Sequence, residues 1–175
     1  MTLYSNLFFY WIALAKNPLY PRFPGVKKAF VLGAGKGTRL KTLTATLPKP
    51  LIPIHQKPLI AYAFDHLIAS GFDCFMINTH HLPGTFSPAF PDETYRDRKL
   101  TFRYEPQLLE TGGGIANIAD WLPSDESFMV YNGDILSDMN LAPAIQAHEN
   151  SSNLVTLVLR SEGEALQVAL DTSSG

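Results

Sequence analysis

The sequence predicts an α/β fold in three layers, with a mostly parallel sheet and helices on both of its faces. Two observations lead to this fold class. Short apolar runs that end at glycine or polar residues alternate along the chain with segments of helical periodicity, as in strand-helix-strand units. The 175 residues, 46% of them hydrophobic and 17% charged, suit one globular domain with a substantial buried core.

The regular pattern begins with a strand, a long loop and a helix. The apolar run Ala29-Phe30-Val31-Leu32 is followed by glycine, which predicts a buried strand. After the loop, apolar residues recur at helical spacing from Leu59 to Ile68, with Pro58 at a first-turn position and Gly71 as a stop signal. We therefore expect a helix between Pro58 and Gly71.

The pattern then continues with shorter elements. Runs at 74–78, 100–104 and 128–132 predict strands, 113–122 and 142–148 predict helices, and 154–159 and 166–170 are rich in β-forming residues. The stretch 80–98 contains three prolines and is expected to be irregular. Ligands of parallel sheets bind where strands end, and two polar segments, Gly33 to Arg39 and Gly133-Asp134, directly follow predicted strands.

The first 26 residues precede this pattern, so we expect a peripheral N-terminal extension followed by one domain over residues 27–175. The nine apolar residues from Leu7 to Ala15 are too few for the roughly 20 that a membrane-spanning helix needs, which argues against a membrane partner. The single cysteine, Cys74, stands in an apolar run, which favours a buried structural thiol and a reducing, cytoplasmic setting.

Charge is distributed unevenly along the chain. The first 64 residues contain nine Lys and Arg and no Asp or Glu, whereas all 16 acidic residues come later. This asymmetry predicts that the first third binds an anion and that the remainder supplies solubility and a cation site. Glycines and prolines interrupt the basic residues, which favours a compact phosphate ligand over nucleic acid.

Three glycines, Gly33, Gly35 and Gly37, follow the first predicted strand. Without side chains in the way, their backbone N–H groups can approach phosphate oxygens. Thr38 stands where both a Walker P-loop and a dinucleotide-binding motif counted from Gly33 need glycine, and no acidic residue occurs before Asp65. The loop is therefore either a phosphate loop of another kind or a plain flexible turn.

Three further parts of the sequence contain candidate chemical groups. Lys49 lies between Pro48 and Pro50, which fix its backbone, and we favour a phosphate contact over a solvated surface lysine. Asp134 is either a metal ligand or a turn residue, and Asp138 nearby suits the same role. The adjacent histidines at 80 and 81 point to opposite sides of an extended segment, which argues against a shared metal.

Four elements resemble, in their order, the motifs of the sugar-1-phosphate nucleotidyltransferases. They are Gly35-Lys36-Gly37-Thr38-Arg39-Leu40, Pro48-Lys49-Pro50, Glu105-Pro106 with Leu109-Glu110-Thr111-Gly112-Gly113-Gly114, and Tyr131-Asn132-Gly133-Asp134. The sequence departs from the family pattern with Gly33 where Ala is usual and Thr42 where Pro is usual. The resemblance implies a Rossmann-like nucleotidyltransferase fold and transfer of a nucleotidyl group from a nucleoside triphosphate to a sugar 1-phosphate.

The resemblance also implies the roles of individual residues. Arg39 and Lys49 would be catalytic, and Asp134 would hold Mg²⁺. The nucleotide would be bound by Leu32, Gly33, Ala34, Gly35, Gly37, Thr38, Arg39, Lys49, Glu105, Glu110, Thr111 and Gly112. UTP or GTP is favoured as the triphosphate, with a sugar 1-phosphate as second substrate and no nucleic acid; the oligomeric state is left open.

Two alternatives to this enzyme remain. The first is a nucleotide- or nucleotide-sugar-binding regulatory domain of the same fold without turnover, which the shortness of the chain favours because the C-terminal sugar-binding part is expected to be incomplete. The second is a nucleic-acid-binding module, which needs a continuous basic surface.

Overall fold

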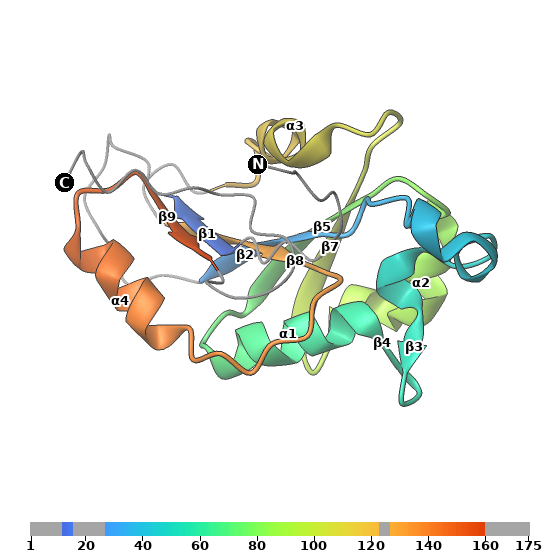
Figure 1. Ribbon diagram of the computed structural model, residues 1–175, viewed down its shortest axis with the longest axis horizontal. Coiled ribbons are helices and arrows are strands. Elements are labelled where there is room, and N and C mark those ends of the chain that lie inside the picture. Colours follow the sequence, from blue (N-terminus) through green and yellow to red (C-terminus); the bar gives the residue numbers. More distant parts are fainter. Residues whose placement is uncertain (1–11, 16–26, 123–126, 160–175) are drawn as a thin grey trace, which may run out of the picture.

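The computed structural model describes residues 12–15, 27–122 and 127–159, and its centre is a seven-stranded sheet with the order β6-β7-β5-β2-β8-β1-β9 (Figure 1). The strands β2 (Lys28–Leu32), β5 (Cys74–Thr79), β7 (Arg98–Tyr104) and β8 (Phe128–Asn132) are parallel to one another. Antiparallel pairs join β6 (Thr94–Tyr95) to β7, and β1 (Ile12–Ala15) to both β8 and β9 (Val155–Val158). The predicted α/β class with a mostly parallel sheet is confirmed.

Helices cover both faces of the sheet. The helices α1 (Leu59–Ala69) and α4 (Ala142–Asn150) lie on one face, and α3 (Glu110–Asn117) lies on the other (Figure 1). The short elements are η1 (Thr38–Thr44), η2 (Lys49–Leu51), β3 (Pro53–Ile54), β4 (Lys57–Pro58), η3 (Pro83–Thr85), α2 (Phe86–Ala89) and η4 (Pro91–Glu93). Of the helices within the described ranges, none has the length and apolar character needed to cross a membrane.

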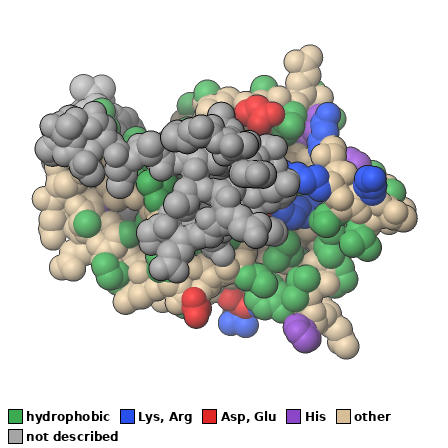
Figure 2. Space-filling model, viewed as in Figure 1, with side chains coloured by type: hydrophobic (Ala, Val, Ile, Leu, Met, Phe, Trp, Pro, Cys, Tyr) green, Lys and Arg blue, Asp and Glu red, His purple; other side chains and the backbone are tan. Residues whose placement is uncertain are grey.

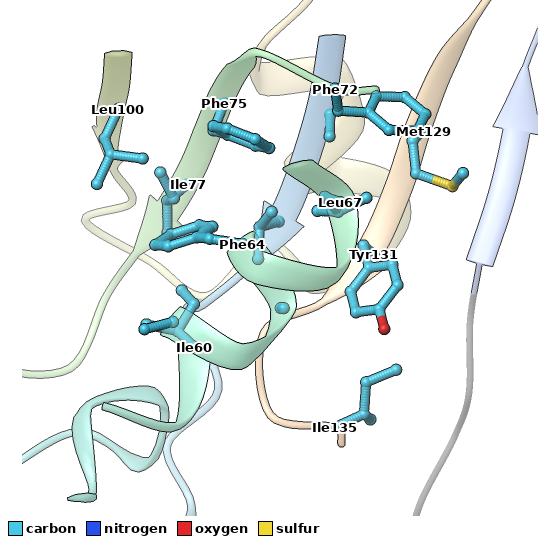
Figure 3. Packing of buried hydrophobic residues seen from close by; sticks show 14 of the residues in the cluster. Ile60, Phe64, Leu67, Phe72, Phe75, Ile77, Leu100, Met129, Tyr131 and Ile135 are labelled. Atoms are coloured by element: carbon cyan, nitrogen blue, oxygen red, sulfur yellow. The ribbon is translucent and has the colours of Figure 1, made fainter. Parts of the chain in front are cut away.

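The larger part of the core lies between the sheet and α1. Phe64 and Leu67 of α1 pack with Phe75 and Ile77 of β5 and with Tyr131 of β8, and all five side chains are buried (Figure 3). Residues three apart lie on the same side of a helix, so the apolar spacing noted in the sequence gives α1 one buried face. Burial of each large apolar side chain contributes about 1.5–3 kcal/mol, which fixes α1 on the sheet.

A second core cluster lies on the opposite face of the sheet. Phe30 of β2, Met76 of β5 and Val130 of β8 pack with Ile118 and Trp121, which follow α3. These strand residues alternate in sequence with the residues of the first cluster, because successive side chains of a strand point to opposite faces. The central strands are therefore buried on both sides, which explains why they are continuous apolar runs in the sequence.

The largest shift from the expected elements concerns α3, which spans Glu110–Asn117 instead of the predicted 113–122. Glycine weakens helices, so the sequence places the helix start after most of the glycine run. However, Gly114 is buried where α3 meets the sheet, and a Cβ there would lie 3.2 Å from both Asn78 Nδ2 and Glu105 Oε1. Close packing at this point, rather than helix propensity, decides where α3 lies.

The ends of the chain contain one strand that the sequence does not indicate. Four residues of the stretch expected to be peripheral, Ile12–Ala15, form β1, which lies between β8 and β9. In the register, Ile12 pairs with Tyr131 on one side and with Val158 on the other. The domain boundary at residue 26 stays a prediction, and the β-rich segment at 166–170 lies outside the described residues.

Candidate active site

A cavity of about 480 Å³ opens at the carboxyl ends of β2, β5 and β8. Parallel strands bring their carboxyl ends to the same edge of a sheet, so residues far apart in the sequence meet there. The cavity is lined by Leu32, Ala34, Gly35, Gly37, Thr38, Arg39, Leu40, Lys49, Pro50, Asn78, Leu108, Glu110, Thr111, Asn132 and Asp134. Figure 2 shows Lys and Arg side chains gathered on the side of the molecule where the loop after β2 and η1 lie in Figure 1.

Most of the residues singled out in the sequence line this cavity. Both Arg39 and Lys49, the residues expected to act on phosphates, are among them, as is Asp134. Three predicted nucleotide-binding residues, Gly33, Glu105 and Gly112, do not line it. The cavity is also lined by Leu40, Pro50 and Asn132, which belong to the quoted motifs but were assigned no role, and by Asn78 and Leu108, which carry no motif signal in the sequence.

The glycine-rich loop is shaped by close contacts. Gly37 has a φ of +59°, and a Cβ at this position would lie 2.8 Å from the Thr44 side chain. A Cβ at Gly33 would lie 2.9 Å from the backbone oxygen of Asn78. Glycine is needed at Gly37 for conformation and at Gly33 for space, whereas nothing lies within 4 Å of a Cβ at Gly35. Gly35 therefore leaves the backbone open toward the cavity that it lines.

Lys49 and Asp134 meet at this cavity. Their side chains form an ion pair with 2.6 Å between Lys49 Nζ and Asp134 Oδ2, and they are 16% and 33% exposed. The buried prolines at 48 and 50 hold the backbone of Lys49 on either side. A charge-assisted contact of this length is strong, so each residue neutralises the other in the ligand-free protein.

The segment that carries Asp134 is fixed before and after the aspartate. Gly133 donates its N–H to the backbone oxygen of Leu32 at 3.0 Å. His66 Nε2 donates to the backbone oxygen of Met139 at 2.7 Å, so its Nδ1 accepts the hydroxyl proton of Tyr131, also at 2.7 Å. These bonds tie α1 to β8 and to the loop that follows it, and they hold Asp134 at the cavity.

Glu105 is fully buried beside the cavity. Its Oε1 accepts a hydrogen bond from Asn78 Nδ2 at 2.9 Å, and its Oε2 accepts one from the Leu109 N–H at 3.2 Å. Asn78 Oδ1 accepts the Gly33 N–H at 2.8 Å. The sequence places Glu105 in a motif but contains no sign that its carboxylate is directed into the protein.

Two acidic residues, Glu110 and Asp134, line the cavity, and the Asp134 carboxylate suits a metal ion whose other donors come from a bound phosphate ligand and water. Within the described ranges, no cluster of three or more His, Cys, Asp and Glu side chains suits a metal ion. Magnesium commonly binds through one or two carboxylates together with phosphate oxygens and water. The Asp134 carboxylate fits such a set of donors. The histidines at 80 and 81 bond different backbone oxygens, those of Glu105 and Thr44, and do not form a metal pair.

Comparisons with known proteins agree with this architecture. The family model described as nucleotidyl transferase matches residues 28–167. A mannose-1-phosphate guanylyltransferase of Mycobacterium tuberculosis is 37% identical over 136 residues, which cover 78% of this chain and 38% of that protein. An N-acetylmuramate alpha-1-phosphate uridylyltransferase of Neisseria meningitidis serogroup B is 38% identical over 120 residues, which cover 68% of this chain and 52% of that protein.

A solved structure shows the same fold. The UDP-glucose pyrophosphorylase of Acinetobacter baumannii superposes with a TM-score of 0.64 at 19% identity, covering 73% of this chain and 54% of that one. The chain spans 38% and 52% of the lengths of the two curated relatives. Because the family model matches most of its length, the chain belongs to the nucleotidyl transferase family, and these relatives are sugar-1-phosphate nucleotidyltransferases.

Proposed function

We propose that this protein transfers a nucleotidyl group from a nucleoside triphosphate to a sugar 1-phosphate. A phosphate oxygen of the sugar 1-phosphate attacks the α-phosphorus, the bond from that phosphorus to the oxygen shared with the β-phosphate breaks, and pyrophosphate leaves. The observation that carries the proposal is the Lys49–Asp134 pair, 2.6 Å apart, in a cavity that the glycine-rich loop also lines.

The chemistry requires positive charge more than a strong base. A phosphate monoester has a second pKa of about 6, so the attacking group is already largely a dianion at pH 7. The protein must hold two anions together and stabilise the charge of the leaving pyrophosphate. Lys49 would contact the α-phosphate and the attacking phosphate, Arg39 would contact the triphosphate, and open backbone N–H groups near Gly35 would contact phosphate oxygens.

Asp134 would hold Mg²⁺ in the loaded protein, where the ion neutralises phosphate charge. Since Asp134 is one-third exposed, its carboxylate can accept a new cationic partner without first being uncovered. Lys49 is then released from part of its interaction with Asp134 and is available to a phosphate. The ion pair therefore keeps both charges in place at the cavity before the substrates arrive.

The identity of the base and the sugar is part of the proposal. The names of the two relatives specify guanylyl and uridylyl transfer, and GTP and UTP are accordingly the first triphosphates to test. Mannose 1-phosphate and N-acetylmuramate 1-phosphate are the matching sugar phosphates by the same names.

The test is a pyrophosphate-release assay with the purified chain, Mg²⁺, each triphosphate and each sugar phosphate, together with the reverse reaction from nucleotide sugar and pyrophosphate. We expect release that requires all three components and is lost in the Lys49→Ala protein. Binding of triphosphate without release, in both directions, would favour the alternative of a nucleotide-binding domain without turnover. Absence of both binding and release would refute the proposal.

A further inference from the structure

Asn78 lies at the point where two walls of the cavity meet. It is buried near the end of β5, between β2 and β7 in the sheet, and it lines the cavity. The glycine-rich loop follows β2 and forms one wall, and the segment Leu108–Thr111 follows β7 and forms another. No motif in the sequence singles out this asparagine.

The two polar atoms of the Asn78 side chain bond to different walls. Oδ1 accepts the Gly33 N–H at 2.8 Å, and Nδ2 donates to Glu105 Oε1 at 2.9 Å. Glu105 Oε2 in turn accepts the Leu109 N–H at 3.2 Å. The bonds form one continuous line from the Gly33 backbone through two buried side chains to the backbone at Leu109, where α3 begins.

The chemistry of the partners fixes the orientation of the amide. A backbone N–H needs an acceptor and a carboxylate needs a donor, so only Oδ1 toward Gly33 and Nδ2 toward Glu105 satisfies both. Neither a carboxylate nor an apolar side chain at position 78 can do this. Within the described part of the chain Glu105 has no salt bridge, so hydrogen-bond donors such as the Asn78 amide stabilise its carboxylate.

The packing around this line leaves little room for another arrangement. A Cβ at Gly114 of α3 would lie 3.2 Å from both Asn78 Nδ2 and Glu105 Oε1. His80 Nδ1 also bonds the backbone oxygen of Glu105 at 2.9 Å. A change in the Asn78 bond is therefore transmitted to α3 and to the loop before it.

We propose that Asn78 is a positioning residue for nucleotide binding, whose amide sets the spacing between the glycine-rich loop and the segment Leu108–Thr111. The inference rests on the proposed function, in which these two walls hold different parts of one nucleotide. A nucleotide that spans both walls binds well only when their spacing matches its length. Inorganic tripolyphosphate, which has no base, requires the phosphate wall alone.

The informative variant is Asn78→Asp. The new carboxylate still accepts the Gly33 N–H but faces the Glu105 carboxylate, and two such groups at hydrogen-bond distance share a proton. The pair keeps that proton at low pH and loses it as the pH rises, so the line of bonds is intact at low pH only. We expect UTP or GTP binding to be at least about tenfold weaker than wild type at pH 8 and to recover toward pH 5.5, with a smaller loss for tripolyphosphate.

The double variant Asn78→Asp with Glu105→Gln reverses the direction of the central bond. The glutamine amide donates to the new carboxylate, and its oxygen accepts the Leu109 N–H. We expect the double variant to regain nucleotide affinity across the pH range. Asn153→Asp is the matched control, because it adds the same charge at an exposed position in the turn before β9.

The readouts separate this inference from the proposed function. Amide exchange at Gly33 and Leu109, followed by NMR without ligand, should be faster in Asn78→Asp at pH 8 and protected again in the double variant. Equal exchange and equal nucleotide binding in wild type and Asn78→Asp, or a double variant no better than the single one, would overturn the inference. A wild-type protein that binds no nucleotide would overturn both the proposed function and the inference, even with the exchange pattern as expected.

Discussion

Replacement of Lys49 by alanine should weaken nucleotide binding strongly while lowering the stability of the fold only slightly. The Lys49 side chain is 16% exposed and the Asp134 side chain 33% exposed, with 2.6 Å between Lys49 Nζ and Asp134 Oδ2. Water can solvate that carboxylate when the lysine is gone, so the folding cost is that of a partly exposed ion pair, about 1 kcal/mol or less. For a chain of this size, about 1 kcal/mol corresponds to a decrease in Tm of roughly 2–4 °C.

The cost for nucleotide binding is larger. A lost charge-assisted contact to a phosphate costs about 1.5–3 kcal/mol, which corresponds to an affinity roughly 10- to 150-fold weaker. The Asp134 carboxylate, no longer neutralised, adds repulsion toward the triphosphate that higher salt reduces. We therefore expect Lys49→Ala to lose binding by more than tenfold at low ionic strength while the fold persists.

The assay is isothermal titration of UTP and GTP with Mg²⁺ at low and at physiological salt, beside thermal melts of each variant. Lys36→Ala is the matched control, because it removes one charge from an exposed position of the glycine-rich loop that does not line the cavity. If Lys36→Ala weakens binding as much as Lys49→Ala, net charge and not the position of Lys49 determines affinity. Unchanged binding in Lys49→Ala would refute the phosphate role of this lysine.

Four further predictions test other parts of the molecule. Asp134→Asn should remove the Mg²⁺ dependence of triphosphate binding, as measured by titration with and without the metal; a dependence that persists would place the metal elsewhere. Removal of residues 1–26 takes β1 from between β8 and β9 and should lower the Tm by several degrees, whereas an unchanged melt would support a peripheral extension. Gly114→Ala should lower the Tm because its Cβ meets two atoms at 3.2 Å, while Gly112→Ala, with nothing within 4 Å, should leave it unchanged or slightly raised, and equal effects would contradict this packing. Burial raises the pKa of the Cys74 thiol above its ordinary value, so alkylation by iodoacetamide at neutral pH should be slower than that of a free thiol and should accelerate only at high pH; rapid alkylation of the native protein at pH 7 would contradict this.

The strands of the central sheet could be predicted from the sequence because they are buried on both faces. Phe30, Met76 and Val130 stand between residues that face α1, and the resulting continuous apolar runs are easily recognised. The helix α1 was predictable for the same kind of reason, since its apolar spacing reflects one buried face. In these strands and in α1, the apolar residues that form the sequence pattern are the same residues that are buried in the core.

The parts that sequence reasoning missed depend on contacts between distant residues. β1 is only four residues long and pairs with strands from the far end of the chain, so nothing local identifies it. Asn78 is an ordinary polar residue near the end of a strand, and its importance arises from partners on two neighbouring loops. In hindsight, an asparagine at the end of a central strand, beside a glycine loop, is a usable signal.

The position of β1 also bears on the order in which the protein forms during synthesis. Residues 12–15 leave the ribosome long before β8 and β9, yet they complete the sheet only by lying between those two strands. The four parallel strands can assemble while β1 is still an unpaired apolar segment. Addition of β1 and β9 to the sheet next to β8 is therefore a late step that joins distant parts of the chain. The edge of β8 stays open until β1 pairs with it, and the outer edge of β1 stays open until β9 is made, so chaperones or other unfinished chains can bind there.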